Sequence, residues 1–285
     1  MAEVVVCGPA SWNLIVDVDV LPAAVPHTLF ATASHETVGG TSAGKALHLV
    51  DLGRDVLLHT VLGTDEAAGS VERALASAGV PFSADVVPGP TERHLNLMDP
   101  DGRRVSIYLH LPAPVEEPAD PSLVAAMSQA RALVMDLSTR SRALLETARA
   151  TGVPIWTDLH DYDGTAEFHR PWLEAADYVF MNDDGLPEPL DFMHGLVEGA
   201  RARLVVCTLG SRGAVAVDGD HRVHEVPAAP VAEVVDTNGA GDAFMAGCLS
   251  AVLDGGDVPC ALTAGAAQAV RALSTRHLSP LLDDV

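Results

Sequence analysis

Residues 236–244 read DTNGAGDAF, and an apolar run that extends to Leu253 follows them. The small residues at 239–241 let the backbone bend tightly, so that successive N–H groups can point toward one ligand. A helix predicted over about 241–253 adds the positive end of its dipole at the same place. This stretch therefore predicts a site for a bound anion at the start of a helix.

Asp242 lies in the first turn of that predicted helix, beside the anion site. A carboxylate there can accept the proton of a hydroxyl group while the neighbouring N–H groups stabilise charge on a transferred phosphoryl group. An aspartate at a helix start is also commonly a simple N-terminal cap. The residues alone leave both interpretations of Asp242 open, the catalytic base and the helix cap.

The rest of the chain alternates β-branched runs with helical patterns. Strands are predicted at 4–6, 56–58, 132–135, 155–158, 178–180 and 204–208, and helices at 43–52, 67–78 and 260–273. This alternation is typical of a parallel sheet flanked by helices. Two further stretches, 14–38 and 93–111, alternate polar and apolar residues around turn residues at 99–102, and they predict a small separate sheet.

The composition narrows the classes of partner. Lys and Arg total 17 against 39 Asp and Glu, a formal charge of -22, and such a surface repels nucleic acids and anionic lipids. The four cysteines form no CxxC pair, and the N-terminal MAEVVVCGPA has neither a basic region nor a long apolar segment. We expect a cytoplasmic protein without nucleic-acid or membrane partners.

The string DTNGAGDAFMAG closely resembles the signature of the ribokinase-like (PfkB) family of sugar and nucleoside kinases. Further matches follow in the family's order at 4–8, 38–40, 63–69 and 208–214. The resemblance implies an α/β fold with a doubly wound, mostly parallel sheet. It implies one kinase domain over residues 1–285, with β-lid segments at about 12–38 and 91–112, and ATP and Mg²⁺ as cofactors.

The resemblance also assigns roles to residues. It implies that Asp242 is the base for the acceptor hydroxyl and that the backbone amides of Gly239, Ala240 and Gly241 hold the phosphate. On the nucleotide side the matching residues are Thr208, Gly210, Gly213, Asn182 and Asn238. On the substrate side they are Ser11, Asn13, Gly39, Gly40, Thr41 and Gly44, together with Asp242. Asp158, at a predicted strand end, and Asp184 are the candidates for binding Mg²⁺.

Several positions depart from the family pattern. Gly44 stands where an asparagine that contacts the sugar is common, and Gly185 replaces the glutamate of the N-x-x-E motif that begins at Asn182. These departures leave the acceptor open between a sugar and a nucleoside such as adenosine. They also leave open a sugar- or nucleoside-responsive binding protein that kept the fold without turnover.

The predicted lid strands carry apolar residues at alternate positions. These positions are Leu95, Leu97, Ile107 and Leu109. A thin sheet has little else to bury against, so the pattern predicts a homodimer through the lid. The histidines of these strands, His94 and His110, are expected at the surface.

Residues 39–46, GGTSAGKA, contain the start of a P-loop, GxxxxGK. Ala46 replaces the hydroxyl residue that a P-loop needs, and we expect no strand directly before Gly39 in a βα unit. We therefore interpret Lys45, the single lysine of the chain, as an ordinary helix residue. Its substitution by alanine is expected to leave turnover nearly unchanged.

Overall fold

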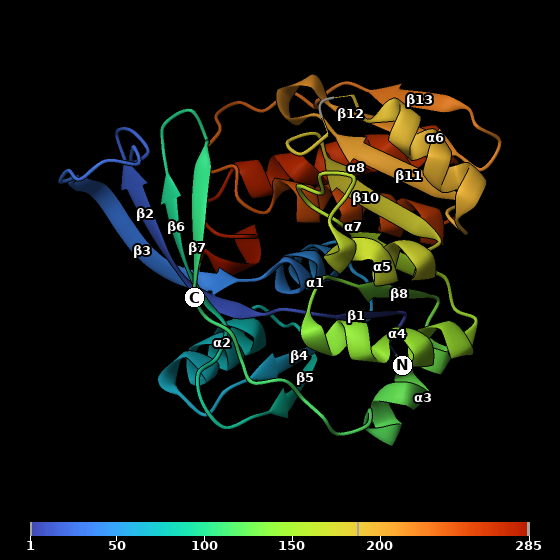
Figure 1. Cartoon of the computed structure of the whole chain (residues 1–285), viewed down its shortest axis with the longest axis horizontal. Coiled ribbons are helices and arrows are strands. Elements are labelled where there is room, and N and C mark those ends of the chain that lie inside the picture. Colours follow the sequence, from blue (N-terminus) through green and yellow to red (C-terminus); the bar gives the residue numbers. More distant parts are fainter. Residues whose placement is uncertain (1, 187, 284–285) are drawn as a thin grey trace.

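The computed structural model describes residues 2–186 and 188–283, and a long twisted sheet runs through it (Figure 1). Within the described residues this sheet has nine strands in the order β13-β12-β11-β10-β9-β8-β1-β4-β5. The strands are β1 (Val4–Cys7), β4 (Val56–Leu62), β5 (Phe82–Val86), β8 (Ala132–Met135), β9 (Ile155–Asp158), β10 (Tyr178–Asn182), β11 (Leu204–Thr208), β12 (Ala214–Asp218) and β13 (Val223–Val226). The pairs from β5 to β11 are parallel, and β12 and β13 add an antiparallel edge.

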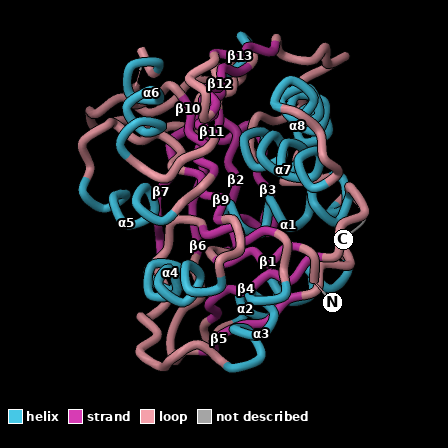
Figure 2. The backbone as a smooth tube through the Cα atoms, turned by 90° about the vertical axis from the view of Figure 1, so that its right-hand side faces the viewer, coloured by secondary structure: helices cyan, strands magenta, loops and turns pink. Residues whose placement is uncertain are grey.

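Helices cover both faces of the long sheet, as the edge-on view of Figure 2 shows. One face carries α1 (Thr41–Asp51), α2 (Glu66–Ser77), α7 (Ala240–Leu253) and α8 (Val258–Leu273), and the other carries α3 (Pro121–Gln129), α4 (Thr139–Thr151), α5 (Arg170–Ala175) and α6 (Leu190–Gly199). Within β1, Val4 and Val6 pack into the first core, whereas Val5 and Cys7 pack into the second. Because such strands are buried on both faces, they read as continuous apolar runs. The predicted fold class is confirmed.

A second sheet is formed by β2 (Ser11–Val18), β3 (Ala31–Gly39), β6 (Arg93–Met98) and β7 (Arg104–His110), in the order β3-β2-β6-β7. The β2–β6 pair is parallel and the other two pairs are antiparallel. Cross-strand neighbours share one face of a sheet. One face carries two rows of cross-strand neighbours: Leu14–Leu95–Ile107 and Val16–Leu97–Val105. The other face carries the row Ile15–Asn96–Ser106 and the pair His94–Tyr108. The lid sheet, residues 11–39 and 93–110, thus has one apolar and one mainly polar face.

The order of strands creates a reversal point in the long sheet. The chain passes from β1 to β4 and β5 on one side and returns to β8 on the other, so β1 lies between β4 and β8. In open α/β sheets, ligands bind outside the carboxyl ends of the strands at such a point. Asp136 follows β8 directly, and β9, β10 and β11 end at Asp158, Asn182 and Thr208.

The predicted helices are α1, α2, α7 and α8, with ends shifted by a few residues, whereas β5, β12, β13 and α3–α6 were not expected. A strand does run up to Gly39, since β3 ends there, but it is not part of a βα unit of the long sheet. That strand belongs to the lid sheet, and α1 begins at Thr41, which leaves no phosphate-binding loop between them.

In the described ranges, no helix is long and apolar enough to cross a bilayer. The described residues also include three short 3-10 helices: η1 (Glu167–His169), η2 (Gly210–Arg212) and η3 (Pro280–Leu282).

Candidate active site

The N-terminus of α7 has free backbone donors. Gly239 is its N-cap, with a left-handed φ of 80°, and no side chain caps the helix. Among the described residues, no oxygen accepts a hydrogen bond from the N–H of Gly239, Gly241 or Asp242, and the Ala240 N–H lies 3.4 Å from the Thr237 carbonyl oxygen. Together with the helix dipole, these N–H groups form a site suited to an anion.

The Asp242 side chain does not cap its own helix. Its Oδ1 accepts hydrogen bonds from Thr41 Oγ1 at 2.5 Å and from Lys45 Nζ at 2.7 Å. Its Oδ2 faces Gly44, where an added Cβ would lie 2.7 Å away, and it has no hydrogen-bond donor within the described residues. One carboxylate oxygen is thus held and the other is free to meet a ligand.

Lys45 is buried to 1% exposure at the carboxyl edge of the long sheet. Besides Asp242, its Nζ lies 3.2 Å from Asp136 Oδ1 and 3.3 Å from Asp158 Oδ2. The residue does belong to helix α1, but it is not an ordinary helix residue, because its ammonium group contacts three carboxylates. Sequence reasoning could have noticed only that the single lysine follows the signature glycines.

The charges of this cluster shape its pKa values. Burial alone would lower the pKa of Lys45, but Asp136, Asp242 and Asp158 together raise it above its ordinary value. Burial raises the pKa of Asp136, whose Oδ2 accepts a hydrogen bond from Ser42. Burial also opposes ionisation of Asp158, yet His160 and Lys45 hold its pKa at about 2. The ammonium group of Lys45 therefore stays charged.

The predicted substrate-side residues meet where β2 begins and β3 ends. Ser11 pairs with Gly39 across the strands, and its Oγ donates to Asn13 Oδ1 at 2.8 Å. A Cβ at Gly39 would lie 2.0 Å from Asn13 Nδ2, and Gly40, with φ of 92°, is the N-cap of α1. The two glycines therefore bring this buried polar group close to the start of α1.

The predicted nucleotide-side residues lie at the ends of β10 and β11. Asn182 and Thr208 are cross-strand neighbours, and Thr208 Oγ1 donates to the Met181 carbonyl oxygen at 3.3 Å. Gly210 and Gly213 both have positive φ, and a Cβ at Gly213 would lie 2.0 Å from the Val226 carbonyl oxygen. The turn around η2 therefore requires glycine for its shape.

Gly185 cannot hold the glutamate that the family pattern has at this position. A Cβ there would lie 2.5 Å from the Asp161 carbonyl oxygen and 2.6 Å from that of Tyr162. The loop after β9, where His160 has a left-handed φ of 55°, occupies this space. The sequence showed the missing glutamate but not the loop that replaces it.

The residues proposed for Mg²⁺ do not form a metal-binding group. In residues 2–186 and 188–283, no group of three or more His, Cys, Asp or Glu side chains is placed to hold a metal ion. Asp158 is paired with Lys45 instead, and Asp184 is exposed, with its N–H bonded to Asn182 Oδ1 at 3.0 Å. The described residues therefore do not fit a metal ion held by the protein alone.

The lid sheet reaches the start of α7 through the turn between β6 and β7. Thr237 Oγ1 donates to the Gly102 carbonyl oxygen at 3.1 Å, and Arg104 donates to Asn238 Oδ1 at 2.8 Å. The expectation of a surface His94 is wrong, since it is buried, bonded to Glu92 at 3.0 Å and packed on Tyr108, whereas His110 is exposed. The lid is thus in contact with the loop that carries the free N–H groups.

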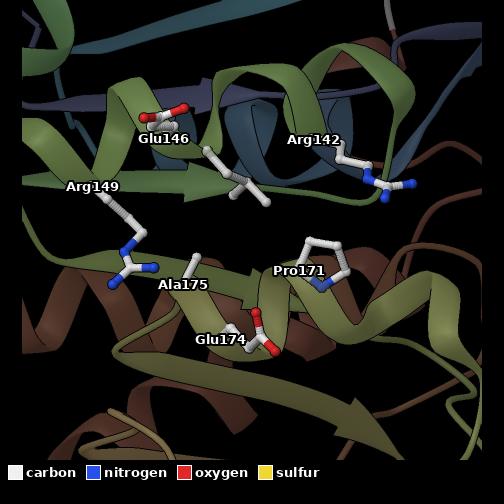
Figure 3. Close-up of a pocket in the computed structure, with 7 residues that line it drawn as sticks. Arg142, Glu146, Arg149, Pro171, Glu174 and Ala175 are labelled. Atoms are coloured by element: carbon white, nitrogen blue, oxygen red, sulfur yellow. The ribbon is translucent and has the colours of Figure 1, made fainter.

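A surface groove of about 380 Å³ lies elsewhere, between α4 and α5. Figure 3 shows Arg142 and Arg149 of α4 opposite Pro171, Glu174 and Ala175 of α5. None of the predicted site residues lines it. The candidate site lies instead where α1, α7 and the carboxyl ends of the strands converge.

Comparison with known proteins gives matches over nearly the whole chain. The model of the family described as "pfkB family carbohydrate kinase" matches residues 1–282. The acarbose 7(IV)-phosphotransferase of Actinoplanes sp. is 33% identical over 93% of this chain and 89% of its own, and the ATP-dependent ribose-1-phosphate kinase of Halopiger xanaduensis is 31% identical over 92% and 88%.

Solved structures give a similar result. The microbiome-derived acarbose kinase Mak1 is 32% identical, with a TM-score of 0.85 over 96% of this chain and 94% of its own. The Arabidopsis thaliana ribokinase complexed with ribose and ATP is 20% identical, with a TM-score of 0.80 over 99% of both chains, which shows a shared fold.

Proposed function

Because the chain belongs to the pfkB family of carbohydrate kinases, we propose that it transfers the γ-phosphoryl group of ATP to a hydroxyl group of a carbohydrate, with Asp242 as the base. The observation that carries this proposal is the free Oδ2 of Asp242 next to the free N–H groups that begin α7. The two features supply a proton acceptor and an anion site at one place.

In this mechanism the acceptor hydroxyl oxygen attacks the γ-phosphorus, and the bond from that phosphorus to the oxygen it shares with the β-phosphate breaks. The hydroxyl proton passes to Asp242 Oδ2, while the N–H groups of Gly239, Ala240 and Gly241 stabilise the oxygens of the transferred group. The nucleotide is bound by the residues at the ends of β10 and β11 and before α7, namely Asn182, Thr208, Gly210, Gly213 and Asn238. Mg²⁺ would be supplied together with ATP and would neutralise phosphate charge, because the described residues offer no ligand set of their own for it.

The acceptor is proposed to bind between the lid and the start of α1. Asp242 Oδ2 faces this region. The residues that lie there are Ser11, Asn13, Gly39, Gly40, Thr41 and Gly44. The similarity to the acarbose 7(IV)-phosphotransferase and to acarbose kinase makes acarbose the first acceptor to test.

The three cysteines that are buried, Cys7, Cys207 and Cys248, are free thiols, which suits a reducing cytoplasm.

The test of the function measures ATP consumption and the mass of the product with acarbose, ribose, ribose-1-phosphate, fructose, adenosine and inosine. Phosphorylation of an oligosaccharide or sugar supports the proposal. Phosphorylation of a nucleoside alone moves the acceptor to the nucleoside class. Tight binding of one of these ligands with no phosphorylation in any mixture contradicts the kinase proposal and supports a binding protein.

Asp242→Asn tests the base directly, because it keeps the size of the side chain and removes the charge that accepts the proton. We expect kcat to fall by roughly 10² to 10⁴ while ATP affinity stays unchanged, since backbone amides bind the phosphates. Initial rates and calorimetric titration of ATP measure the two effects. The matched control is Asp254→Asn at the other end of α7, where the exposed carboxylate pairs with Arg54. Full turnover in Asp242→Asn would exclude this residue as the base.

A further inference from the structure

Lys45 contacts the proposed base through a defined hydrogen bond. Its Nζ donates to Asp242 Oδ1 at 2.7 Å and also donates to Thr41 Oγ1, which itself donates to the same Oδ1. Both donors come from the first turns of α1 and act on one oxygen of the carboxylate. A carboxylate held at one oxygen has a fixed plane, so the direction of the other oxygen is fixed as well.

The second oxygen of Asp242 is kept free by the neighbouring residue. Gly44 has no Cβ to fill the space beside Oδ2, where such an atom would lie only 2.7 Å away. The pair Gly44-Lys45 thus leaves one oxygen open and holds the other. This arrangement depends on two adjacent residues of α1 and one residue of α7.

The ammonium group is itself held from the opposite side. Asp136 Oδ1 and Asp158 Oδ2 lie 3.2 and 3.3 Å from Nζ, at the ends of adjacent strands of the long sheet. A lysine buried to 1% exposure and surrounded by carboxylates has little freedom to change rotamer. The carboxyl ends of β8 and β9 therefore fix the position of Nζ, and Nζ fixes the position of Asp242.

We propose that Lys45 is a positioning residue, which holds Asp242 Oδ1 so that Oδ2 points at the acceptor hydroxyl. The proposal rests on the proposed function, since it assigns Lys45 to the phosphoryl transfer that Asp242 catalyses. It replaces the role of an ordinary helix residue that the sequence suggested. The consequence is a specific kinetic signature, because a positioned base affects the chemical step and not the binding of either substrate.

Lys45→Met tests this role, because methionine fills most of the same space and has no donor. We expect kcat to fall by roughly 10²-fold, the cost of misplacing a reacting group, with the KM of ATP and of the acceptor changed by less than about threefold. The rates are measured with the acceptor that the wild-type protein phosphorylates in the test of function. They are divided by the amount of folded protein, which circular dichroism measures. A kcat within about threefold of wild type would overturn the proposal.

A charge-balanced variant separates positioning from charge. Lys45→Met with Asp136→Asn removes one positive and one negative charge, so the formal charge of the cluster stays the same. If Lys45 only neutralises buried carboxylates, this double variant recovers turnover, and that recovery would overturn the proposal. If Lys45 positions Asp242, the double variant regains thermal stability and keeps the low kcat.

A further variant covers the case in which the Lys45 variants fail to fold. Thr41→Val removes the second donor to Oδ1 without a change of charge, and we expect kcat to fall about tenfold with the KM of ATP unchanged. An unchanged kcat in Thr41→Val counts against the proposal.

His48→Gln is the matched control. This buried residue of α1 bonds to the Leu278 carbonyl oxygen and to Gln268 and makes no hydrogen bond to Asp242, so its variant is expected to lose stability and keep kcat. A comparable fall of kcat in His48→Gln would overturn the proposal.

Wild-type protein that phosphorylates nothing contradicts the proposed function, whereas active wild type with active Lys45→Met contradicts only this inference.

Discussion

Gly44 shows how a single residue can be read differently in the sequence and in the structure. In the sequence it marks the loss of an asparagine expected to contact the sugar. In the structure its missing Cβ leaves the space that Asp242 Oδ2 occupies, 2.7 Å from where that atom would be. The residue at this position therefore controls how close α1 and the proposed base can approach, apart from any contact with the acceptor.

Gly44→Ala is expected to lower kcat by roughly 10²-fold, because the added methyl group displaces the Asp242 carboxylate from its position. Steady-state rates and the melting temperature measure the effect. Gly195→Ala is the matched control, since Gly195 lies within helix α6 with open space around it. That substitution is expected to stabilise the protein by about 0.5–1 kcal/mol and to leave kcat unchanged. Equal turnover of the two variants would show that Gly44 has no effect on the base.

At the scale of elements, the lid sheet has one apolar face and one mainly polar face, and its tip contacts the start of α7. Its polar face includes His94, Asn96 and Ser106, and its tip contacts Thr237 and Asn238 at the start of α7. The contact joins the lid to the loop that holds the transferred phosphoryl group in the proposed mechanism. Closure of the lid and completion of the anion site are therefore expected to occur together.

Arg104→Ala removes the side-chain contact of the lid with Asn238. We expect the KM of the acceptor to rise about tenfold, and hydrolysis of ATP without acceptor to rise, because water enters a site that the lid covers less completely. Coupled assays with and without acceptor measure both effects. Arg222→Ala is the control, because this exposed arginine of the β12–β13 turn pairs with Asp220, far along the chain from the lid. Unchanged coupling in Arg104→Ala would separate the lid tip from catalysis.

At the scale of the whole molecule, the surface is strongly acidic, with 39 acidic residues against 17 basic ones. Its exposed apolar residues include Val105, Ile107 and Leu109, which alternate along β7, an edge strand of the lid. The neighbouring rows through Leu14, Leu95, Val16 and Leu97 extend this apolar face. A thin sheet gains stability when such a face is buried, and a second lid offers a matching surface.

We predict a homodimer that forms through the apolar lid face. Light scattering at micromolar concentration is expected to give twice the 29.7 kDa mass of the chain. Ile107→Asp is expected to give the monomer, because burying an unpaired carboxylate costs several kcal/mol. Leu190→Asp, an exposed apolar residue of α6, is the control and is expected to stay dimeric. A wild-type mass of 29.7 kDa would contradict the prediction.

The sequence by itself determined the fold class, the strands at the centre of the long sheet and the stretch that begins α7. It could do so because these features depend on neighbouring residues: buried parallel strands read as short apolar runs, and the proposed anion site consists of consecutive amides at 239–242. The cap of α2 is local in the same way, because Asp65 accepts a hydrogen bond from the Ala68 N–H three residues later.

Only the tertiary structure decided the surroundings of Lys45, Gly185 and His94. The partners of Lys45 lie 91, 113 and 197 positions further along the chain, at Asp136, Asp158 and Asp242. No local pattern encodes such distances, because a lysine in an apolar helix reads the same whether its ammonium group meets solvent or three carboxylates. The fold brings these side chains together by placing the first turns of α1 and α7 at the carboxyl ends of β8 and β9, and burial then makes their charges interact strongly.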